Sequence, residues 1–411
     1  MVSRKLNICI FTRITNAHGI CGGMERHTDI LCEGFVSLGH KVTVITTRHP
    51  SNIQYEEIKG VRYYYLEKTR PGLYRNGWGK ESIKKFEELN EYNPFDIVLS
   101  ESTGATSYVL NKNKFKLPVV TILHGTGFTE LQSTFKEISS ITSFYRFLKR
   151  FVSITFDYFY DFIHLYRTDA IIVVSNELNN QVRKEYFINP NKVYTIYNGI
   201  DTGYFQPNRT KGYIIRQKYG IKEDEILIIV SSNLEYQKGI HTAIKAFNGV
   251  LNKFNKMKLM VIGKGAYEKK LREMADKLNL ANKVIFTGYI SYNSIADYYN
   301  ACDLFLMPTL RVEGFPMVLA EVMACEKTII ASKIGGIPSS IDDGINGILL
   351  PPGDINLLSQ NIIKVLNDKN FADRLAKNGR QRAVNEFSKE KMVAETIKVF
   401  EICLKKQKDL H

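Results

Sequence analysis

The sequence predicts an α/β protein with two doubly wound parallel sheets, one in each half of the chain, that face a common cleft. Short apolar runs rich in Val and Ile alternate with longer amphipathic segments, which is the pattern of repeated strand and helix units. The alternation occurs in two series, and only helical patterns remain beyond Leu350. A chain of 411 residues is also long enough for two or three domains at roughly 150 residues each.

The predicted elements follow one another in a regular order. In the first half the strands are expected at Leu6–Thr12, Lys41–Thr47, Val61–Glu67, Asp96–Glu101, Pro118–Leu123, Ala170–Ser175 and Val193–Tyr197. In the second half they are expected at Ile226–Ser231, Lys258–Ile262, Val284–Thr287, Leu304–Pro308, Thr328–Ser332 and Ile348–Leu350. Helical patterns include Ile240–Phe254, Ala266–Leu278, Pro316–Ala324, Asn356–Leu366, Phe371–Glu386 and Lys389–Leu404.

The two series meet near Asn198–Gly220, a stretch that contains Pro207 and Asn208 and has no clear periodicity. This composition is typical of a linker. We therefore expect a first domain over residues 1–205, a second over 206–385, and a final helix within 386–411 that returns to pack on the first.

Composition and charge exclude several classes of protein. The net charge of +14 suggests an anionic partner, but the basic residues form no tail and no nucleic-acid motif is present, so nucleic acid is not expected as a ligand. Six cysteines without a CxxC pair indicate reduced thiols in a cytoplasmic protein. No apolar stretch reaches the ~18 residues of a membrane span, so any membrane association is expected to be peripheral, on the inner face.

Ligands of doubly wound folds bind at the carboxyl ends of the strands, so the junctions that follow the strands carry the candidate sites. After the first strand, Gly22 and Gly23 open a helix and leave amides free for a phosphate; a tight turn is the alternative interpretation. After the fifth predicted strand, His124 and Gly125 can reach a ligand hydroxyl, although such a histidine can also be purely structural.

In the second half, Lys238 and Gly239 precede a helix whose amino end can hold a diphosphate together with the ammonium group. Gly263 repeats this arrangement one strand later. Solvated loop residues are the alternative interpretation of both.

The densest signal is the segment from Glu313 to Glu321, in which Gly314, Phe315 and Pro316 end a loop and begin a helix. Two carboxylates eight residues apart flank a free helix N-terminus. We expect the amides to bind a phosphate and the carboxylates to accept hydrogen bonds from sugar hydroxyls.

Taken together, these motifs resemble the retaining glycosyltransferases of family 4, also called group 1, whose fold of two Rossmann-like domains is known as GT-B. The most specific match is Glu313-Gly-Phe-Pro followed by Glu321, and the resemblance covers nearly the whole chain. Supporting matches are Gly22-Gly23-Met-Glu25-Arg, His124-Gly125, Tyr197-Asn198-Gly199-Ile-Asp201 with Phe205 and Pro207, Lys238-Gly239, and Asn346-Gly347 with Pro351 and Asp354.

The resemblance implies an acceptor-binding first domain and a second domain that binds a nucleotide-diphospho-sugar, with UDP or GDP as the nucleotide. It implies contacts of Glu313 and His124 with the sugar, of Glu321 with the ribose, and of Tyr289 with the base. The diphosphate would be held by Lys238 and by the amides of the Gly22-Gly23 loop, Phe315, Met317, Val318 and Leu319. The implied catalytic residues are His124, Glu313 and Lys238.

One position departs from the family pattern. The family commonly has an arginine five residues before the lysine, and here that position is Asn233. Loss of a bidentate guanidinium removes a phosphate contact of about 1.5–3 kcal/mol. Three consequences are open. The affinity for the donor can be lower, Arg311 can take the place of the missing arginine, or the donor can be a different sugar nucleotide.

The expected reaction is transfer of a hexose-type sugar to a hydroxyl group of a glycan, a glycolipid or a lipid-linked precursor, with retention of configuration, in polysaccharide or glycolipid biosynthesis. No Asp-x-Asp sequence is present, so no metal is expected and no cofactor beyond the donor. The aromatic and basic stretch from Phe135 to Arg167 suggests contact with an anionic membrane, or else a helix that buries its aromatic face.

Two other functions remain open at this stage. A sugar-nucleotide 2-epimerase shares the architecture and needs no acceptor. A catalytically inactive subunit that only binds a sugar nucleotide is the second alternative, supported by Asn233.

Overall fold

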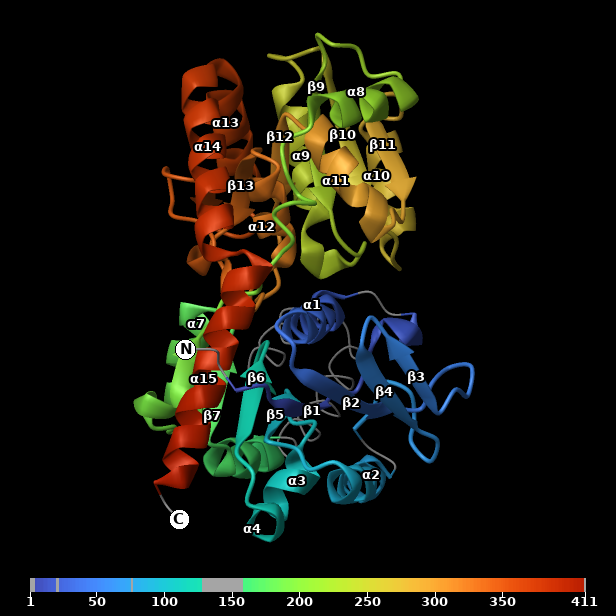
Figure 1. Ribbon diagram of the computed structural model, residues 1–411. Coiled ribbons are helices and arrows are strands. Elements are labelled where there is room, and N and C mark those ends of the chain that lie inside the picture. The colour runs from blue at the N-terminus through green and yellow to red at the C-terminus, as the bar shows by residue number, and fades with distance from the viewer. Residues whose placement is uncertain (1–3, 20–21, 75–76, 128–157, 410–411) are drawn as a thin grey trace, which may run out of the picture. The chain divides into compact units, whose positions relative to one another are not determined.

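The computed structural model describes residues 4–19, 22–74, 77–127 and 158–409, and the chain divides into two units (Figure 1). Unit 1 comprises Met1–Gly199 together with Lys389–His411, and unit 2 comprises Ile200–Ser388. Each unit contains one predominantly parallel sheet with helices, as the sequence predicts for a pair of Rossmann-like domains.

The sheet of unit 1 has the strand order β3-β4-β2-β1-β5-β6-β7-β8. Its neighbouring strands are parallel except for the antiparallel pair β3 and β4. The strands are β1 (Asn7–Phe11), β2 (Lys41–Thr47), β3 (Tyr55–Ile58), β4 (Val61–Leu66), β5 (Ile97–Glu101), β6 (Val119–Leu123), β7 (Ala170–Val173) and β8 (Val193–Thr195). The described residues of unit 1 include the helices α1 (Gly23–Ser37), α2 (Trp78–Tyr92), α3 (Thr106–Leu110), α4 (Lys112–Phe115), α7 (Asn176–Glu185) and α15 (Lys389–Lys408), a helical stretch at 158–167, and the 3-10 turns η1 (Asn16–His18) and η2 (Pro190–Lys192).

The edge strand β3 is absent from the sequence-based prediction. Its four residues, Tyr-Glu-Glu-Ile, are mostly exposed and lack the buried alternation that identifies a strand. The strand forms because Lys59 and Gly60 both adopt positive φ, at 50° and 80°, and close a two-residue hairpin turn onto β4.

The sheet of unit 2 is entirely parallel, with the order β11-β10-β9-β12-β13-β14. The strands are β9 (Ile226–Ser231), β10 (Met257–Ile262), β11 (Val284–Gly288), β12 (Leu304–Met307), β13 (Thr328–Ser332) and β14 (Ile348–Leu350). The helices are α8 (Arg209–Lys218), α9 (Ile240–Val250), α10 (Glu268–Lys277), α11 (Tyr292–Ala301), α12 (Met317–Ala324), α13 (Ile355–Asn367) and α14 (Lys369–Glu386), with turns η3 (Tyr236–Lys238) and η4 (Ile337–Ser339).

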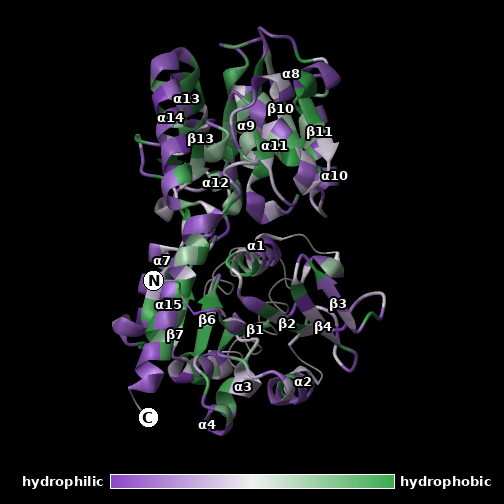
Figure 2. Ribbon diagram, in the orientation of Figure 1, coloured by the Kyte–Doolittle hydropathy of each residue, from purple (hydrophilic) through white to green (hydrophobic). Residues whose placement is uncertain are grey.

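Burial of apolar side chains on the sheets supplies the cores. In unit 2 the residues of β9 and β10 pack with α9 and α13 in one cluster, in which Phe247 and Ile362 are fully buried. Figure 2 shows hydrophobic strands such as β6 and β7, whereas most residues of α14 are hydrophilic. At about 25 cal/mol per Å² of buried apolar surface, this burial is the main favourable term for folding.

The final helix α15 belongs to unit 1, where it packs against α1. The rings of Phe35 and Phe400 lie 5.5 Å apart. Gly34 allows this approach, because a Cβ atom there would lie 2.3 Å from a methyl carbon of Val393.

The prediction of a linker near Asn198–Gly220 is wrong for most of these residues. Residues 209–218 form α8, which packs against α11, and Gly212 faces the backbone of Asn300 so closely that a Cβ atom would lie 2.5 Å from its oxygen. The side chain of Asn208 caps the helix by accepting a hydrogen bond from the amide of Lys211 at 3.0 Å.

The boundary between the units also differs from the expected position at 205/206. Phe205 is fully buried in unit 2, with its ring 5.5 Å from that of Tyr292 and 6.3 Å from that of Tyr299. The chain therefore enters unit 2 at Ile200, which pairs with Ser388.

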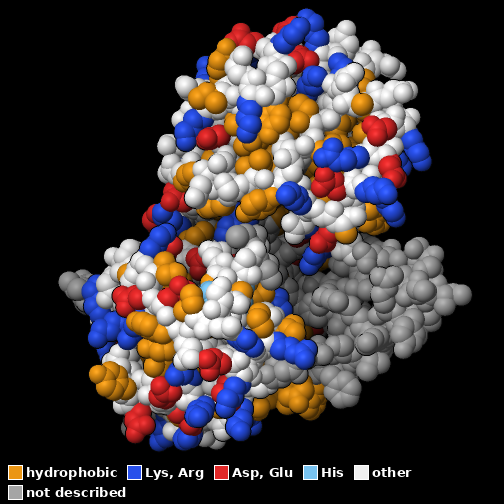
Figure 3. All heavy atoms as spheres, turned by 90° about the vertical axis from the view of Figure 1, so that its right-hand side faces the viewer, with side chains coloured by type: hydrophobic (Ala, Val, Ile, Leu, Met, Phe, Trp, Pro, Cys, Tyr) orange, Lys and Arg blue, Asp and Glu red, His pale blue; other side chains and the backbone are white. Residues whose placement is uncertain are grey.

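Within the described residues, none of the helices combines the length and the apolar run that a bilayer span requires. On the face shown in Figure 3, Lys and Arg side chains lie scattered among acidic and apolar ones.

Candidate functional site

In unit 2 the strand order reverses between β9 and β12, because the chain runs from β9 to one side of the sheet and from β12 to the other. Such a switch point leaves room for a ligand beyond the carboxyl ends of the two central strands. Lys238 lies in the loop after β9 and Glu313 in the loop after β12. The topology thus brings together two residues that are 75 positions apart in the sequence.

Lys238 and Glu313 form an ion pair, with Nζ and Oε1 2.7 Å apart. Their side chains are only 16% and 15% exposed, so solvent screens the pair less than it screens a surface pair. The hydroxyl of Thr309 donates to the same carboxylate oxygen at 3.4 Å. The structure therefore holds a cation and a hydrogen-bond acceptor at the switch point, where each partially neutralises the other.

Glycines fix the backbones of the loops around this pair. Gly239 has φ 68°, and a Cβ atom there would lie 1.8 Å from the carbonyl oxygen of Pro308. Gly335, with φ 56°, lies against the backbone of Glu313, and the amide of Gly336 donates to the Glu313 carbonyl at 2.7 Å. The loops after β9, β12 and β13 are thus packed backbone to backbone, which positions the Glu313 side chain.

The next two loops along the sheet edge are joined in the same way. Gly263 adopts φ 131° and leaves no room for a Cβ atom, which would lie 1.9 Å from the Ser232 oxygen. Its amide donates to the carbonyl of Gly288 at 2.9 Å. Tyr289 follows directly and is 57% exposed, so its ring is available to stack on a planar ligand.

The N-terminus of α12 begins at Met317, after the cap residue Pro316. Met317 and Val318 belong to the first helical turn, where a helix supplies no carbonyl for its own amides. Leu319 is different, because its amide already donates to the Pro316 carbonyl at 3.0 Å. Phe315 is buried and its ring packs 5.2 Å from that of Phe387, which anchors the loop that contains Gly314.

Glu321 is 1% exposed and accepts a hydrogen bond from the hydroxyl of Tyr299 at 3.4 Å. It lies one turn into α12. Asn233 and Arg311, the position of the family departure and its suggested substitute, are both exposed on the loops after β9 and β12.

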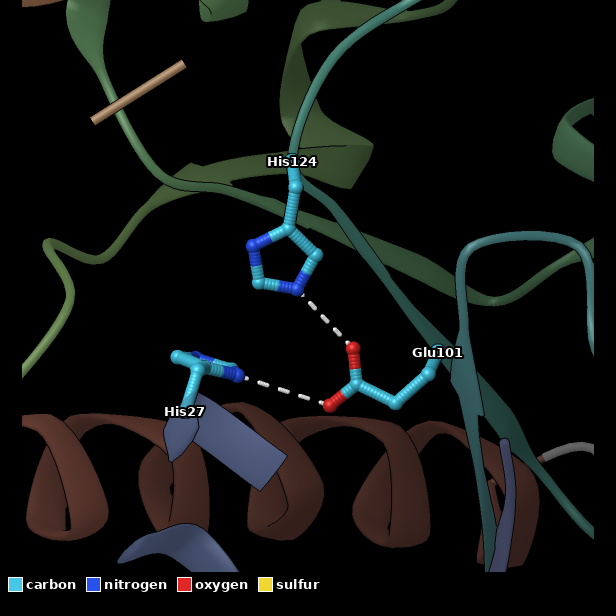
Figure 4. A group of neighbouring side chains, drawn as sticks. All are labelled: His27, Glu101 and His124. Carbon is cyan, nitrogen blue, oxygen red and sulfur yellow. Dashed lines mark hydrogen bonds and ion pairs between the residues drawn. The ribbon is translucent and has the colours of Figure 1, made fainter. Parts of the chain in front are cut away.

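In unit 1 the corresponding switch point lies between β1 and β5. Three side chains meet there: His27 from α1, Glu101 from the end of β5, and His124, which follows β6 (Figure 4). One carboxylate oxygen of Glu101 lies 2.9 Å from Nε2 of His124, and the other lies 3.5 Å from Nδ1 of His27. The two imidazole rings contact each other edge to face, with centroids 4.7 Å apart.

The cluster is strongly shielded, since His27 is 2% exposed, Glu101 1% and the His124 side chain 17%. Burial alone raises the pKa of Glu101, but hydrogen bonds and charge interactions with His124 and His27 outweigh burial and lower it to about 2. Burial lowers the pKa of His27 despite the adjacent carboxylate. At neutral pH, Glu101 is therefore ionised and His27 is a neutral imidazole.

Two histidines and one carboxylate are also residue types that bind metal ions. In Figure 4, however, one nitrogen of each imidazole is directed at a different oxygen of Glu101, so the carboxylate bridges the two rings. Only the contact between Glu101 and His124 is a hydrogen bond, because Nδ1 of His27 and the oxygen that it faces have no hydrogen-bond partner within the described residues. A metal ion would have to displace the contact between Glu101 and His124.

The Gly22-Gly23 loop does not contain the positive φ that a tight turn would need, since Gly22 has φ −100°. The side chain of Glu25 folds back over it instead, and a Cβ atom on Gly22 would lie 2.4 Å from Oε2 of Glu25. Glu25 is 5% exposed. The N-terminus of α1 thus already has a carboxylate of its own nearby.

Sequence reasoning missed Glu101 and gave no role to His27. A signal was present for Glu101, because it is a charged residue at the carboxyl end of a buried strand adjacent to the strand before His124. His27 occupies the second turn of α1 and carries no comparable signal. Of the aromatic and basic stretch 135–167, only residues from 158 onward lie within the described part of the chain.

Each of the two units matches a known protein family. The family "Glycosyl transferases group 1" matches residues 213–382, and "Glycosyltransferase Family 4" matches residues 21–204. Each match falls almost entirely within one of the two units.

Individual relatives are similar along most of the chain. The N-acetyl-α-D-glucosaminyl L-malate synthase of Bacillus anthracis is 27% identical over 380 residues, which cover 87% of this chain and 88% of that one. Sucrose-phosphate synthase of Thermosynechococcus elongatus has the same fold, with a TM-score of 0.81, 20% identity, and coverage of 97% and 99%. The Anabaena protein HepE, solved in complex with UDP-glucose, gives a TM-score of 0.73, 18% identity, and coverage of 96% and 99%.

Proposed function

We propose that this chain, which belongs to the group 1 (family 4) glycosyltransferases, moves a hexose-type sugar from a nucleotide-diphospho-sugar to a hydroxyl acceptor with retention of configuration. The observation that carries the proposal is the Lys238–Glu313 pair at the switch point of unit 2. A ligand that contains both a diphosphate and a sugar can contact both members of the pair. The phosphate attracts the ammonium, and the sugar hydroxyls donate to the carboxylate.

In the proposed complex, Lys238 turns from Glu313 to the diphosphate, assisted by the amides of Met317 and Val318. Glu313 is then released to accept hydrogen bonds from the sugar. Tyr289 borders the base, and Glu321 accepts from the ribose. Leu319 is left out of the phosphate contacts because its amide is already used by Pro316.

The proposed transfer is a front-side displacement. The bond between the anomeric carbon and the phosphate oxygen breaks, the acceptor oxygen bonds to the same carbon from the same face, and its proton passes to the departing phosphate oxygen. Lys238 stabilises the charge that develops on the leaving diphosphate. His124 and Glu313 are proposed to contact the sugar as it becomes cationic.

Relatives support the class of donor. The HepE structure contains UDP-glucose, and the Bacillus anthracis relative is named for an N-acetyl-α-D-glucosaminyl product. We propose a UDP- or GDP-linked hexose as the donor and a glycan, glycolipid or lipid-linked precursor as the acceptor. No feature of the structure favours a 2-epimerase or an inactive subunit.

A thermal-shift screen of UDP- and GDP-sugars tests the proposal. A donor at 100 times its Kd stabilises the folded protein by about 2.7 kcal/mol. The donor that is identified is then incubated with hydroxyl acceptors, and the anomeric configuration of the product is read by NMR. Stabilisation by none of these donors, or an inverted product, contradicts the proposal.

We predict that transfer is independent of divalent metal. The leaving group has Lys238 and two helix amides to stabilise it, and the chain has no Asp-x-Asp sequence. The measurement is the initial rate after dialysis against EDTA, expected within about 2-fold of the untreated rate. Complete loss in EDTA that manganese restores would show the prediction to be wrong.

We also propose that unit 1 contacts anionic membranes. Residues 158–167 are helical, and three aromatic side chains on this segment are largely exposed: Phe159 at 64%, Tyr160 at 57% and Tyr166 at 67%. Exposed aromatic rings favour an interfacial position, and Arg167 adds a basic side chain at the end of this segment. The protein is expected to float with anionic but not neutral vesicles at low salt, and replacement of the three rings by Ser is expected to weaken binding. Failure to bind anionic vesicles would contradict the proposal.

A further inference from the structure

The second ring nitrogen of His124 has a different environment from the first. Nε2 contacts the buried carboxylate of Glu101, whereas Nδ1 points away from it, as Figure 4 shows. His124 is also the most exposed member of the cluster. Nδ1 is therefore the atom of the cluster that is placed to meet a ligand.

Hydrogen-bond directions in the cluster follow from the charge of Glu101. An ionised carboxylate only accepts hydrogen bonds, so Nε2 of His124 must carry a hydrogen. Nδ1 of His27 faces the other oxygen at 3.5 Å, but these two buried atoms are not hydrogen-bonded. The hydrogen-bond direction is therefore fixed for His124 and not for His27.

We propose that Glu101 is a positioning residue for the transfer reaction, which holds His124 as the Nε2–H tautomer so that Nδ1 offers a lone pair to a substrate hydroxyl. The role in transfer rests on the proposed function, whereas the tautomer itself does not. His27 supports the arrangement by packing beside the second oxygen of Glu101, which lies 3.5 Å from its Nδ1, and so restrains the carboxylate.

The tautomer matters because the two forms of imidazole recognise a hydroxyl in opposite ways. With a lone pair on Nδ1, His124 accepts the hydrogen of a hydroxyl and leaves its oxygen lone pairs free. With a hydrogen on Nδ1, it can only donate to the hydroxyl oxygen. A carboxylate at Nε2 enforces the first form, and an amide in its place permits both, because an amide also donates.

The first experiment is independent of activity. Imidazole nitrogens of the full chain are labelled with ¹⁵N and recorded at neutral pH in EDTA, and the signals of His124 are assigned from the His124→Gln variant. We expect a protonated Nε2 and an unprotonated Nδ1 in the native protein, and a mixture of tautomers in Glu101→Gln. An Nδ1–H tautomer in the native protein would overturn the proposal, as would zinc binding at stoichiometric amounts to both histidines.

The second experiment measures turnover. Glu101→Gln is expected to lower kcat about 10- to 100-fold with the donor KM within about 2-fold, because the tautomer is altered and the donor site of unit 2 is untouched. Glu185→Gln is the matched control, since Glu185 is a half-buried carboxylate of unit 1 that bonds Gln181 and, within the described residues, has no hydrogen bond or ion pair with a histidine. The control is expected to retain native kcat.

Variants of His27 keep the test decisive if Glu101→Gln fails to fold. His27→Asn retains a polar group close to the Nδ1 position and is expected to keep most of the native kcat. His27→Leu places an apolar side chain beside the Glu101 carboxylate and is expected to lower kcat. Equal kcat in Glu101→Gln, His27→Leu and the native protein overturns the positioning role. If the native protein transfers sugar from none of the donors, the proposed function is contradicted, whereas the result on the His124 tautomer is unaffected.

Discussion

Glu313→Gln is expected to reduce transfer on the order of 100- to 1000-fold while the free nucleoside diphosphate binds as tightly as before or more tightly. In the native structure Lys238 is paired with Glu313 at 2.7 Å, so the diphosphate must compete with a carboxylate for the ammonium. Glutamine removes that competitor and the negative charge beside the phosphate. It also removes the charged acceptor that would stabilise the cationic sugar.

The two effects separate in two measurements: calorimetry with UDP or GDP gives the affinity, and initial rates with the donor give turnover. Glu235→Gln is a suitable control, because Glu235 is an exposed carboxylate in the same loop as Lys238. It is expected to change neither quantity by more than about 2-fold. Native turnover in Glu313→Gln would contradict the assignment of the donor site.

The sequence was sufficient to name residues that the structure places at the carboxyl ends of the strands of unit 2, but not the pairing of Lys238 with Glu313. Lys238, Gly263, Glu313 and Tyr289 each follow a strand that could be recognised as a short apolar run, and parallel strands direct such residues to one edge. The contact between Lys238 and Glu313 depends on β9 and β12 being neighbours. Strand order is a property of tertiary packing that a single sequence does not encode locally.

The same limit explains the residues that were missed. Glu101 looks like an ordinary strand end, and its two histidine partners come from α1 and from the loop after β6. The linker assignment of residues 198–220 failed for another reason. The apolar face of α8 is short, and one of its contact positions is Gly212, which packs through its backbone and leaves no hydrophobic signal.

Lys238→Met is expected to lower both the turnover of the enzyme and the stability of the folded protein. Turnover falls because the leaving diphosphate loses its cation, and a contact of this kind contributes about 1.5–3 kcal/mol. Stability falls as well, because the Glu313 carboxylate is only 15% exposed and loses its ion-pair partner, keeping the hydrogen bond from Thr309. We expect a loss of about 1–3 kcal/mol in the free energy of unfolding, between the values for surface and buried pairs.

A double-mutant cycle separates these components. Glu313→Gln removes the carboxylate that Lys238→Met leaves unpaired, so the double variant is expected to recover most of the stability lost in the Lys238→Met variant, measured by thermal denaturation. It is not expected to recover turnover or affinity for the nucleoside diphosphate. If stability and turnover recovered together, Lys238 would serve only to neutralise Glu313. If affinity for the diphosphate were unchanged in Lys238→Met, the ammonium would have no part in donor binding, and the helix amides of α12 would have to hold the phosphate alone.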